Sequence, residues 1–246
     1  MSVEAVERPK PRKKDDYFVD VVPPLQSGDR LSRPEFERRY HAHPEIKKAE
    51  LVEGVVYMSS PVHFAKHANP HSAVITWLGN YWAATPFVSV GDNATLRLDL
   101  ENEPQPDALL RLEPEVGGRS YEADDDYLEG APELIIEIAA SSASYDLHDK
   151  RRAYARNGVQ EYLVFQTYER RLSWYVLKDG VYELREPAED GILKSEVFPG
   201  LWLKSSAIWE SDLAAVLVTL QRGIQSPEHE AFVSELNARK SGKRKG

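Results

Sequence analysis

A short apolar run that encloses one acidic residue constrains the fold of this chain more than any other feature. Residues 132–140 read PELIIEIAA, in which leucine and isoleucine surround Glu137. Such a nearly continuous apolar run predicts a strand that is buried on both faces of a sheet. A carboxylate there must find a cation, a hydrogen-bond donor or solvent, because burying it unpaired is costly in free energy. Either Glu137 belongs to a site, or its strand lies at a sheet edge and the carboxylate points outward.

A second acidic residue opens another predicted strand, and a lysine follows on the next predicted helix. Asp107 begins the stretch DALLRL, and Lys150 lies within residues 145–158, which have a helical pattern. Two carboxylates side by side could hold a hard divalent cation. A neighbouring ammonium could orient or activate water beside a phosphate, as metal-dependent phosphodiester hydrolysis requires. Alternatively, Lys150 lies on a solvated helix face and pairs with Asp146 or Asp149.

The composition limits the classes of protein that need to be considered. The 246 residues contain no cysteine, which excludes disulfides, thiol nucleophiles and zinc–thiolate sites. No apolar stretch has the length of a membrane span and the first residues lack the apolar core of a secretory signal, so we expect a cytoplasmic protein. The net charge of -9 is weak evidence against a surface that binds nucleic acid throughout, although local phosphate contacts remain compatible with it.

Strand-rich blocks with helices before and after them predict a single α/β domain with a mixed central sheet flanked by helices. We expect this domain to span residues 19–225. Residues 1–18 are charged and contain proline, so they are expected to be disordered. Residues 226–246 form a C-terminal segment with a basic tail that is expected to be flexible.

Helices are predicted over 32–43, 71–84 and 145–158 and from about residue 211 to 221. Ser32 and Glu35 match a capping box at the first helix. The inward-facing residues are expected to be Val74, Ile75, Leu78 and Trp82 in the second helix, and Leu147, Tyr154 and Ala155 in the third. Residues 87–100 predict two short strands around a turn at Gly91–Asn93.

Three histidines recur every fourth residue, at positions 63, 67 and 71. On one helix face, His63, His67 and His71 could bind zinc. Asn69 and Pro70 interrupt that helix, which favours a loop with incidental histidines. His71 is the exception, because it opens the helix over 71–84 and could face a cleft.

Glu50 and Glu53 bracket the start of another predicted strand, and their pattern fits either plain surface charge or a supplementary metal ligand. Motifs for other chemistries are absent from the sequence. It has no phosphate-binding G-x-x-x-x-G-K-[ST] loop, no G-x-G-x-x-G fingerprint and no G-x-S-x-G nucleophile turn.

The order of several segments between Glu50 and Leu203 resembles the "putative restriction endonuclease" family, formerly a domain of unknown function, of the PD-(D/E)XK nuclease superfamily. Its most specific part is the stretch from Pro132 to Phe165. The matching segments are ELVEGVVYMSSP, HSAVITWL, QPDALLRL, PELIIEIAASSAS, DLHDKRRAYARNGVQEYLVF and FPGLWL.

The resemblance implies a restriction-endonuclease-like core with the active site at one end of a mixed sheet. Asp107 matches the aspartate of the first half-motif and Glu137 the acid of the second. The superfamily's lysine usually follows that acid by two residues, where this chain has Ala139, and Lys150 is the residue that fits instead. Auxiliary positions of the family match Glu50 and His71.

The implied function is a metal-dependent DNA endonuclease. Asp107, Glu137 and the backbone carbonyl of Ile138 would bind magnesium or manganese, and Lys150 would orient water or stabilise the transition state. DNA is the implied partner, and a homodimer is an assembly that the resemblance allows. Two alternatives stay open: a nuclease fold that has lost catalysis and binds or regulates, and a metal-binding protein organised around His63, His67 and His71.

Overall fold

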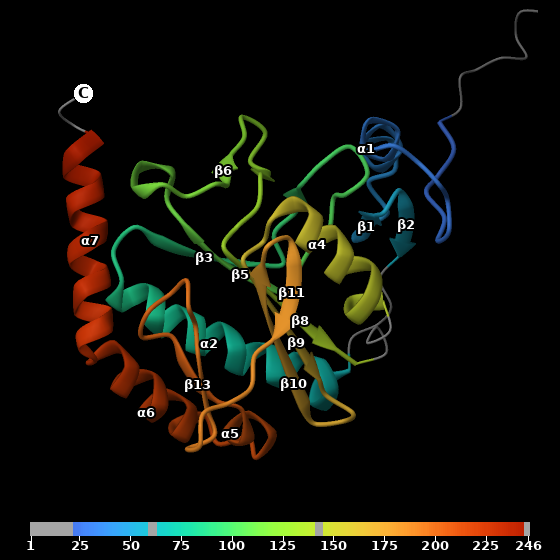
Figure 1. Cartoon of the computed structure of the whole chain (residues 1–246). Helices are drawn as coiled ribbons and strands as arrows, with labels where there is room; N and C mark the ends of the chain where they lie inside the picture. Colours follow the sequence, from blue (N-terminus) through green and yellow to red (C-terminus); the bar gives the residue numbers. More distant parts are fainter. Residues whose placement is uncertain (1–21, 59–62, 141–144, 244–246) are drawn as a thin grey trace, which may run out of the picture.

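A mixed six-stranded sheet forms the centre of a computed structural model, which describes residues 22–58, 63–140 and 145–243 (Figure 1). Its strand order is β11–β10–β9–β8–β5–β3. Within this sheet β8 and β9 run parallel, and the other neighbours are antiparallel. The predicted mixed α/β class is therefore confirmed. The strands are β3 (Val88–Asp92), β5 (Ala108–Leu112), β8 (Leu134–Ala139), β9 (Glu161–Gln166), β10 (Arg171–Lys178) and β11 (Val181–Leu184).

Shorter strands and helices surround the central sheet. The shorter strands pair as β1 (Ala49–Val52) with β2 (Val55–Met58), β12 (Ile192–Lys194) with β13 (Trp202–Lys204), and β4 (Leu96–Arg97) with β7 (Leu128–Glu129) and β6 (Tyr121–Glu122). The helical segments are α1 (Arg33–Ala42), the π-helical turn η2 (Phe64–Ala68), α2 (Asn69–Ala84), the 3₁₀ turn η3 (Pro114–Val116), the π-helical turn η4 (Asp146–Lys150), α4 (Arg151–Asn157), α5 (Ser205–Trp209), α6 (Leu213–Ile224) and α7 (Pro227–Lys243).

Helices cover both faces of the sheet, with α2 on one side and α4 on the other (Figure 1). Residues of even number in β5 and β8, such as Leu110 and Ile136, pack in one core with α2 and α6. Residues of odd number, such as Leu109 and Ile135, pack in a second core with Tyr154 of α4. This alternation follows from the two-residue period of a strand. It also assigns Glu137 to the face that α4 covers.

The helices differ in detail from the predicted faces. In α2 the buried residues are Val74, Trp77, Leu78 and Tyr81, whereas Trp82 is 51% exposed. The stripe is therefore rotated from the predicted one, because Trp77 and Tyr81 fill the core. In α4, Ala153 is buried with Tyr154, and Ala155 is only partly buried. Gly158 ends α4 in the left-handed region, as predicted.

Two local details stand out. The two short strands predicted around Gly91–Asn93 are present as β3 and β4, although they do not pair with each other, because β3 pairs with β5 while β4 pairs with β7. The side chain of Ser32 makes no capping hydrogen bond at α1. Glu35 instead accepts hydrogen bonds from Arg38 and Arg39, so it does not reach back to the helix start.

The C-terminal segment also differs from expectation. Residues 227–243, expected to be flexible toward their end, form helix α7, whose residues Phe232 and Leu236 join the main core. The expected disorder of residues 1–18 lies outside the described residues. None of the helices in the described ranges combines the length and the apolar character needed to cross a membrane.

Ser32 does not cap α1, whereas Asp212 caps α6, and this contrast predicts different effects of the two residues on stability. The Asp212 side chain caps α6 by accepting a hydrogen bond from the Ala215 amide at 2.9 Å. We expect Asp212→Ala to lower the free energy of unfolding by about 1 kcal/mol, because one amide at the helix start loses its partner. Ser32→Ala, which removes no such bond, should change it by less than about 0.5 kcal/mol. Urea denaturation measures both, and equal losses would contradict the assignment.

Candidate active site

The two predicted acids lie side by side at one end of the central sheet. β5 and β8 pair with Ala108 opposite Ile136, so Asp107 and Glu137 occupy the next opposed positions. The Ile138 amide donates a hydrogen bond to Asp107 Oδ2 at 2.7 Å. Asp107 is 6% exposed and Glu137 is 3% exposed. Because β8 is a central strand, the alternative in which Glu137 points outward from a sheet edge is wrong.

Lys150 reaches this acidic pair from the helical side. Its Nζ lies 2.9 Å from Glu137 Oε1 and 2.9 Å from Glu50 Oε1. Asp146 Oδ1 lies 3.8 Å from the same ammonium. Lys150 is 3% exposed, so the alternative of a solvated helix face is wrong for this residue. One buried ammonium thus joins carboxylates from β1, β8 and η4.

Aromatic residues build the wall behind this ion cluster. Tyr154, one helical turn after Lys150, donates its hydroxyl to Glu137 Oε1 at 2.9 Å. The Tyr154 ring packs edge-on against Tyr162 of β9. The Lys150 ammonium also lies 5.3 Å from the ring centre of Tyr145. These rings keep water from the back of the cluster, which strengthens the interactions between its charges.

Glu50 is brought to the cluster by the β1–β2 hairpin. The turn residues Glu53 and Gly54 both have positive φ, which a tight two-residue turn requires. Leu51 forms a bridge with Glu103 in the segment before β5, which fixes the hairpin against it. Glu50 Oε1 then accepts a hydrogen bond from the Gln105 amide at 2.7 Å. For Glu50, the interpretation as plain surface charge is therefore wrong. Glu53 lies outside this cluster and forms an ion pair with Arg156.

His67 and His71 lie on a helical segment that runs from η2 into α2, with His63 immediately before it, which corrects the loop predicted for them. The Ala68 amide bonds to the His63 carbonyl across five residues, and this wide turn leads directly into α2. His67 Nε2 lies 3.2 Å from Asp107 Oδ1. His71 Nε2 donates to the Asp107 carbonyl at 2.9 Å and lies 3.1 Å from Asp92 Oδ1. Pro70 is the second residue of α2 and does not interrupt the helical segment, which continues from η2 into α2.

The charges around Lys150 do not balance, and the pKa values reflect this. Burial raises the pKa of Glu137 well above its ordinary value, against the attraction of Lys150. Burial opposes the charge on Lys150 as well, but Glu137, Glu50 and Asp146 together raise its pKa well above the usual value. Lys150 therefore stays protonated, while the carboxylates around it outnumber the single cation.

The pKa of Asp107 is shifted in the opposite direction, below its ordinary value. Burial alone would raise its pKa, but the contact with His67 and the hydrogen bond from the Ile138 amide lower it, helped by the charge of Lys150. Asp107 is thus held as a carboxylate while Glu137 resists ionisation. Two neighbouring acids with opposite shifts are typical of sites that handle charge or protons.

The carboxylates of the site fit a magnesium or manganese ion that takes its remaining ligands from water and substrate. The described residues include no group of three or more histidine, aspartate or glutamate side chains arranged to hold a metal ion. Magnesium, however, is commonly bound through one or two carboxylates, with waters and substrate phosphates as its remaining ligands. Asp107 and Glu137 provide two such carboxylates, so the residues fit a metal that arrives with substrate better than a preformed cage. The Ile138 carbonyl remains a predicted further ligand.

Sequence reasoning missed two contacts in the site. The sequence pattern indicates His67 only as an incidental loop residue or a zinc ligand, and Tyr154 only as a core residue. The spacing of Asp146, Lys150 and Tyr154, four residues apart on one helical face, was the signal that could have grouped them. The zinc alternative is not supported, because His67 and His71 both turn toward Asp107, whereas His63 is exposed.

Comparisons with known proteins identify a family and a similar fold. The family model Uma2, described as "Putative restriction endonuclease", matches residues 33–206. A crystal structure described as a putative nuclease of the DUF820 group from Anabaena variabilis is similar with a TM-score of 0.51 and 13% sequence identity. That similarity covers 66% of this chain and 90% of the other, and at this identity it establishes the fold alone. No curated protein sequence matches.

The buried ion cluster predicts a pH-dependent loss of stability. Lys150→Met removes the cation that contacts Glu137, and at pH 8 we expect it to lower the free energy of unfolding by about 3–5 kcal/mol. Burial raises the folded-state pKa of Glu137 and Lys150 opposes that rise, so in the variant this pKa is raised further and the stability it loses as pH rises is larger than in the wild type. The loss caused by Lys150→Met should therefore be smaller at pH 5 than at pH 8, by about 1 kcal/mol or more.

Urea denaturation at the two pH values measures this difference. Arg152→Met is the matched control, because Arg152 lies on the same helix with 63% of its side chain exposed and pairs with Asp149. It should change stability by less than about 0.5 kcal/mol at either pH. A Lys150→Met loss that is the same at pH 5 and pH 8 would contradict the proposed charge balance.

Proposed function

Because this chain belongs to the Uma2 family of putative restriction endonucleases, we propose that it is a metal-dependent DNA endonuclease that hydrolyses phosphodiester bonds. The proposed catalytic residues are Asp107, Glu137 and Lys150. The observation that carries the proposal is the 2.9 Å contact between Lys150 Nζ and Glu137 Oε1. It supports the assignment of Lys150 to the place of the superfamily's lysine, although Ala139 stands at the usual position.

Each residue has a proposed task that follows from its contacts. Asp107 and Glu137 would hold magnesium or manganese, with the Ile138 carbonyl as a further ligand. When bound, the metal would lower the pKa of a coordinated water and neutralise negative charge on the phosphate. Lys150, kept protonated by its acidic neighbours, would donate hydrogen bonds to the attacking water or to the phosphate oxygens.

Other residues would position these groups without touching the reacting atoms. Tyr154 holds Glu137 through its hydroxyl, and His71 holds the backbone of Asp107. Glu50 shares the ammonium of Lys150 with Glu137, so it opposes rotation of the lysine side chain away from the site. Rigid support of this kind is what orients a reactive group before substrate binds. We therefore treat Tyr154, His71 and Glu50 as positioning residues.

Substitution of the three catalytic candidates tests the activity. Asp107→Asn, Glu137→Gln or Lys150→Met should each slow cleavage of plasmid DNA by about 100-fold or more, because the first two remove a proposed metal-holding carboxyl group and the third removes the ammonium proposed to stabilise the transition state. The assay follows nicked and linear products with magnesium or manganese, using variants that circular dichroism shows to be folded. Arg152→Met, with its exposed side chain, should cleave at the wild-type rate.

Two outcomes would change the assignment. Undiminished cleavage by Asp107→Ala and Glu137→Ala variants would rule out this site. Wild-type protein that binds DNA but never cleaves it would support the alternative of a nuclease fold that has lost catalysis.

The two-carboxylate site predicts that metal binding depends on DNA. In calorimetric titrations, magnesium should bind the protein more tightly when an uncleavable phosphorothioate duplex is present, because phosphate oxygens complete its ligand set. An Asp107→Asn, Glu137→Gln double variant should abolish this DNA-dependent heat. Glu45→Gln, which changes an exposed glutamate paired with His43, should not. Equal magnesium affinity with and without DNA would indicate a preformed metal site elsewhere.

A further inference from the structure

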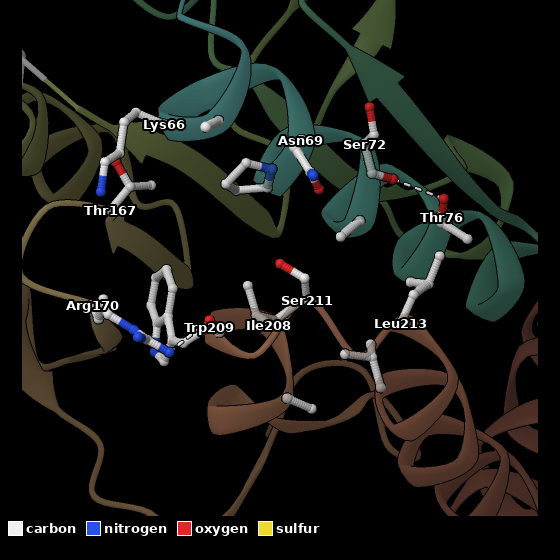
Figure 2. Close-up of a pocket in the computed structure, with 15 residues that line it drawn as sticks. Lys66, Asn69, Ser72, Thr76, Thr167, Arg170, Ile208, Trp209, Ser211 and Leu213 are labelled. Atoms are coloured by element: carbon white, nitrogen blue, oxygen red, sulfur yellow. Dashed lines mark hydrogen bonds between the residues drawn. The ribbon is translucent and has the colours of Figure 1, made fainter.

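A pocket of about 340 Å³ lies beside the candidate active site and shares a helical wall with it (Figure 2). In the segment from η2 to α2, His67 and His71 face Asp107. Other residues of the same segment line the pocket: Ala65, Lys66, Asn69, Pro70, Ser72, Ala73 and Thr76. The opposite wall comes from the β9–β10 turn and from α5 and α6. A side chain in this wall is thus only a helix width from the acids.

The pocket also lies at the same end of the sheet as the acids. Thr167, which lines it, follows β9 and donates its backbone amide to the Ala139 carbonyl at 3.0 Å. Ala139 is two residues after Glu137 on β8. The pocket lies on the α2 face of the sheet and Glu137 on the α4 face, so a chain-like ligand at the acids could reach the pocket by passing around this end of the sheet.

The charge of the pocket is opposite to that of the protein. Lys66 and Arg170 line it, and no acidic side chain does so among the described residues, in a chain with a net charge of -9. Figure 2 shows Lys66, Ser72 and Thr76 along the wall that η2 and α2 form, with Thr167 and Arg170 on the side of the β9–β10 turn. Ammonium, guanidinium, hydroxyl and amide groups of this kind bind phosphate oxygens. The lining therefore favours a ligand with negative charge.

Exposed aromatic rings stand at the two segments that frame the pocket. Phe64 is 76% exposed at the start of η2, and Tyr168 is 55% exposed in the β9–β10 turn. The Lys66 ammonium lies 5.0 Å from the centre of the Tyr168 ring, which links the two segments. Exposed aromatic rings beside basic groups are the usual platform for unpaired bases, which stack on the ring while the cations contact the phosphates.

We infer that this pocket, together with the exposed Tyr168 ring on the neighbouring β9–β10 turn, binds an unpaired nucleotide of the DNA strand, with its base on that ring and its phosphate at Lys66 and Arg170, which line the pocket. The inference rests on the proposed nuclease function for the identity of the strand. The inference implies that the substrate contains a single-stranded stretch beside the phosphodiester bond that is cut. A fully paired duplex offers no exposed base face to such a ring, so it should gain nothing from the pocket.

Binding measured without metal tests this inference separately from catalysis. Fluorescence anisotropy in EDTA compares a labelled 12-nucleotide thymidine strand with a blunt 12-base-pair duplex. Tyr168→Ala should weaken binding of the single strand by about tenfold and leave the duplex unchanged. Tyr168→Phe, which keeps the ring, should restore the affinity. Tyr121→Ala is the control, since Tyr121 is 50% exposed on β6 outside the pocket.

The salt dependence separates the basic contact from the stacking contact. Lys66→Gln should reduce the slope of log affinity against log salt by about 0.7 for the single strand, the value for one lost phosphate contact. Tyr168→Ala should leave that slope unchanged. Arg222→Gln, an exposed charge at the far end of α6, should change neither slope nor affinity. Unchanged thermal midpoints should show that all variants are folded.

Three results would overturn the inference: unchanged single-strand binding by Tyr168→Ala, an equal loss for strand and duplex, or thymidine monophosphate binding as tightly as the 12-nucleotide strand. The last result would assign the pocket to a free nucleotide. A protein that binds the single strand as expected but never cleaves DNA would refute only the nuclease proposal. A protein that cleaves DNA while Tyr168→Ala binds normally would refute only the pocket.

Discussion

The buried ammonium of Lys150 is the interaction on which the rest of the site depends. It lies 2.9 Å from each of two glutamates that come from opposite parts of the chain, Glu50 and Glu137. Without a cation between them, two buried carboxylates at this spacing would repel each other and one would take up a proton. The lysine therefore links the N-terminal hairpin to the central sheet, and it also supplies the charge that the proposed chemistry requires. The same side chain thus serves both stability and the proposed activity.

This coupling explains why distant segments converge so closely. The β1–β2 hairpin brings Glu50, α2 brings His71, β5 and β8 bring the acids, and η4 brings Lys150. Their contacts span up to about a hundred residues of sequence, and Tyr57 of β2 even donates its hydroxyl to Asp149, beside Lys150, at 3.2 Å. A site assembled from so many segments cannot be lost by local unfolding of one element without exposing charges in the others.

How much of this was predictable from the sequence depended on the kind of pattern involved. Asp107 and Glu137 could be identified because Asp107 begins an apolar run and Glu137 interrupts one. A carboxylate in such a run must have a partner or solvent, since burying it unpaired is costly in free energy. Lys150 could not, since its run of charges looks like any solvated helix face and the resemblance to a family was needed. The contact of His67 with Asp107 is not evident from the sequence, because Asn69 and Pro70 are typical of a break in a helix. The inward position predicted for Trp82 is wrong, since the inward face of α2 depends on which rings the core accommodates.

Both helices that carry site residues are preceded by a π-helical turn, η2 before α2 and η4 before α4. Such a turn contains one residue more than an α-helical turn. It therefore rotates the segments before and after it relative to each other by about 100° around the helix axis. His67 and Lys150 lie within these turns. Removing a single residue from either turn would rotate the preceding chain to another face, although no contact residue had changed. In this protein, the number of residues in η2 and η4 therefore determines the site as much as the identity of the residues does.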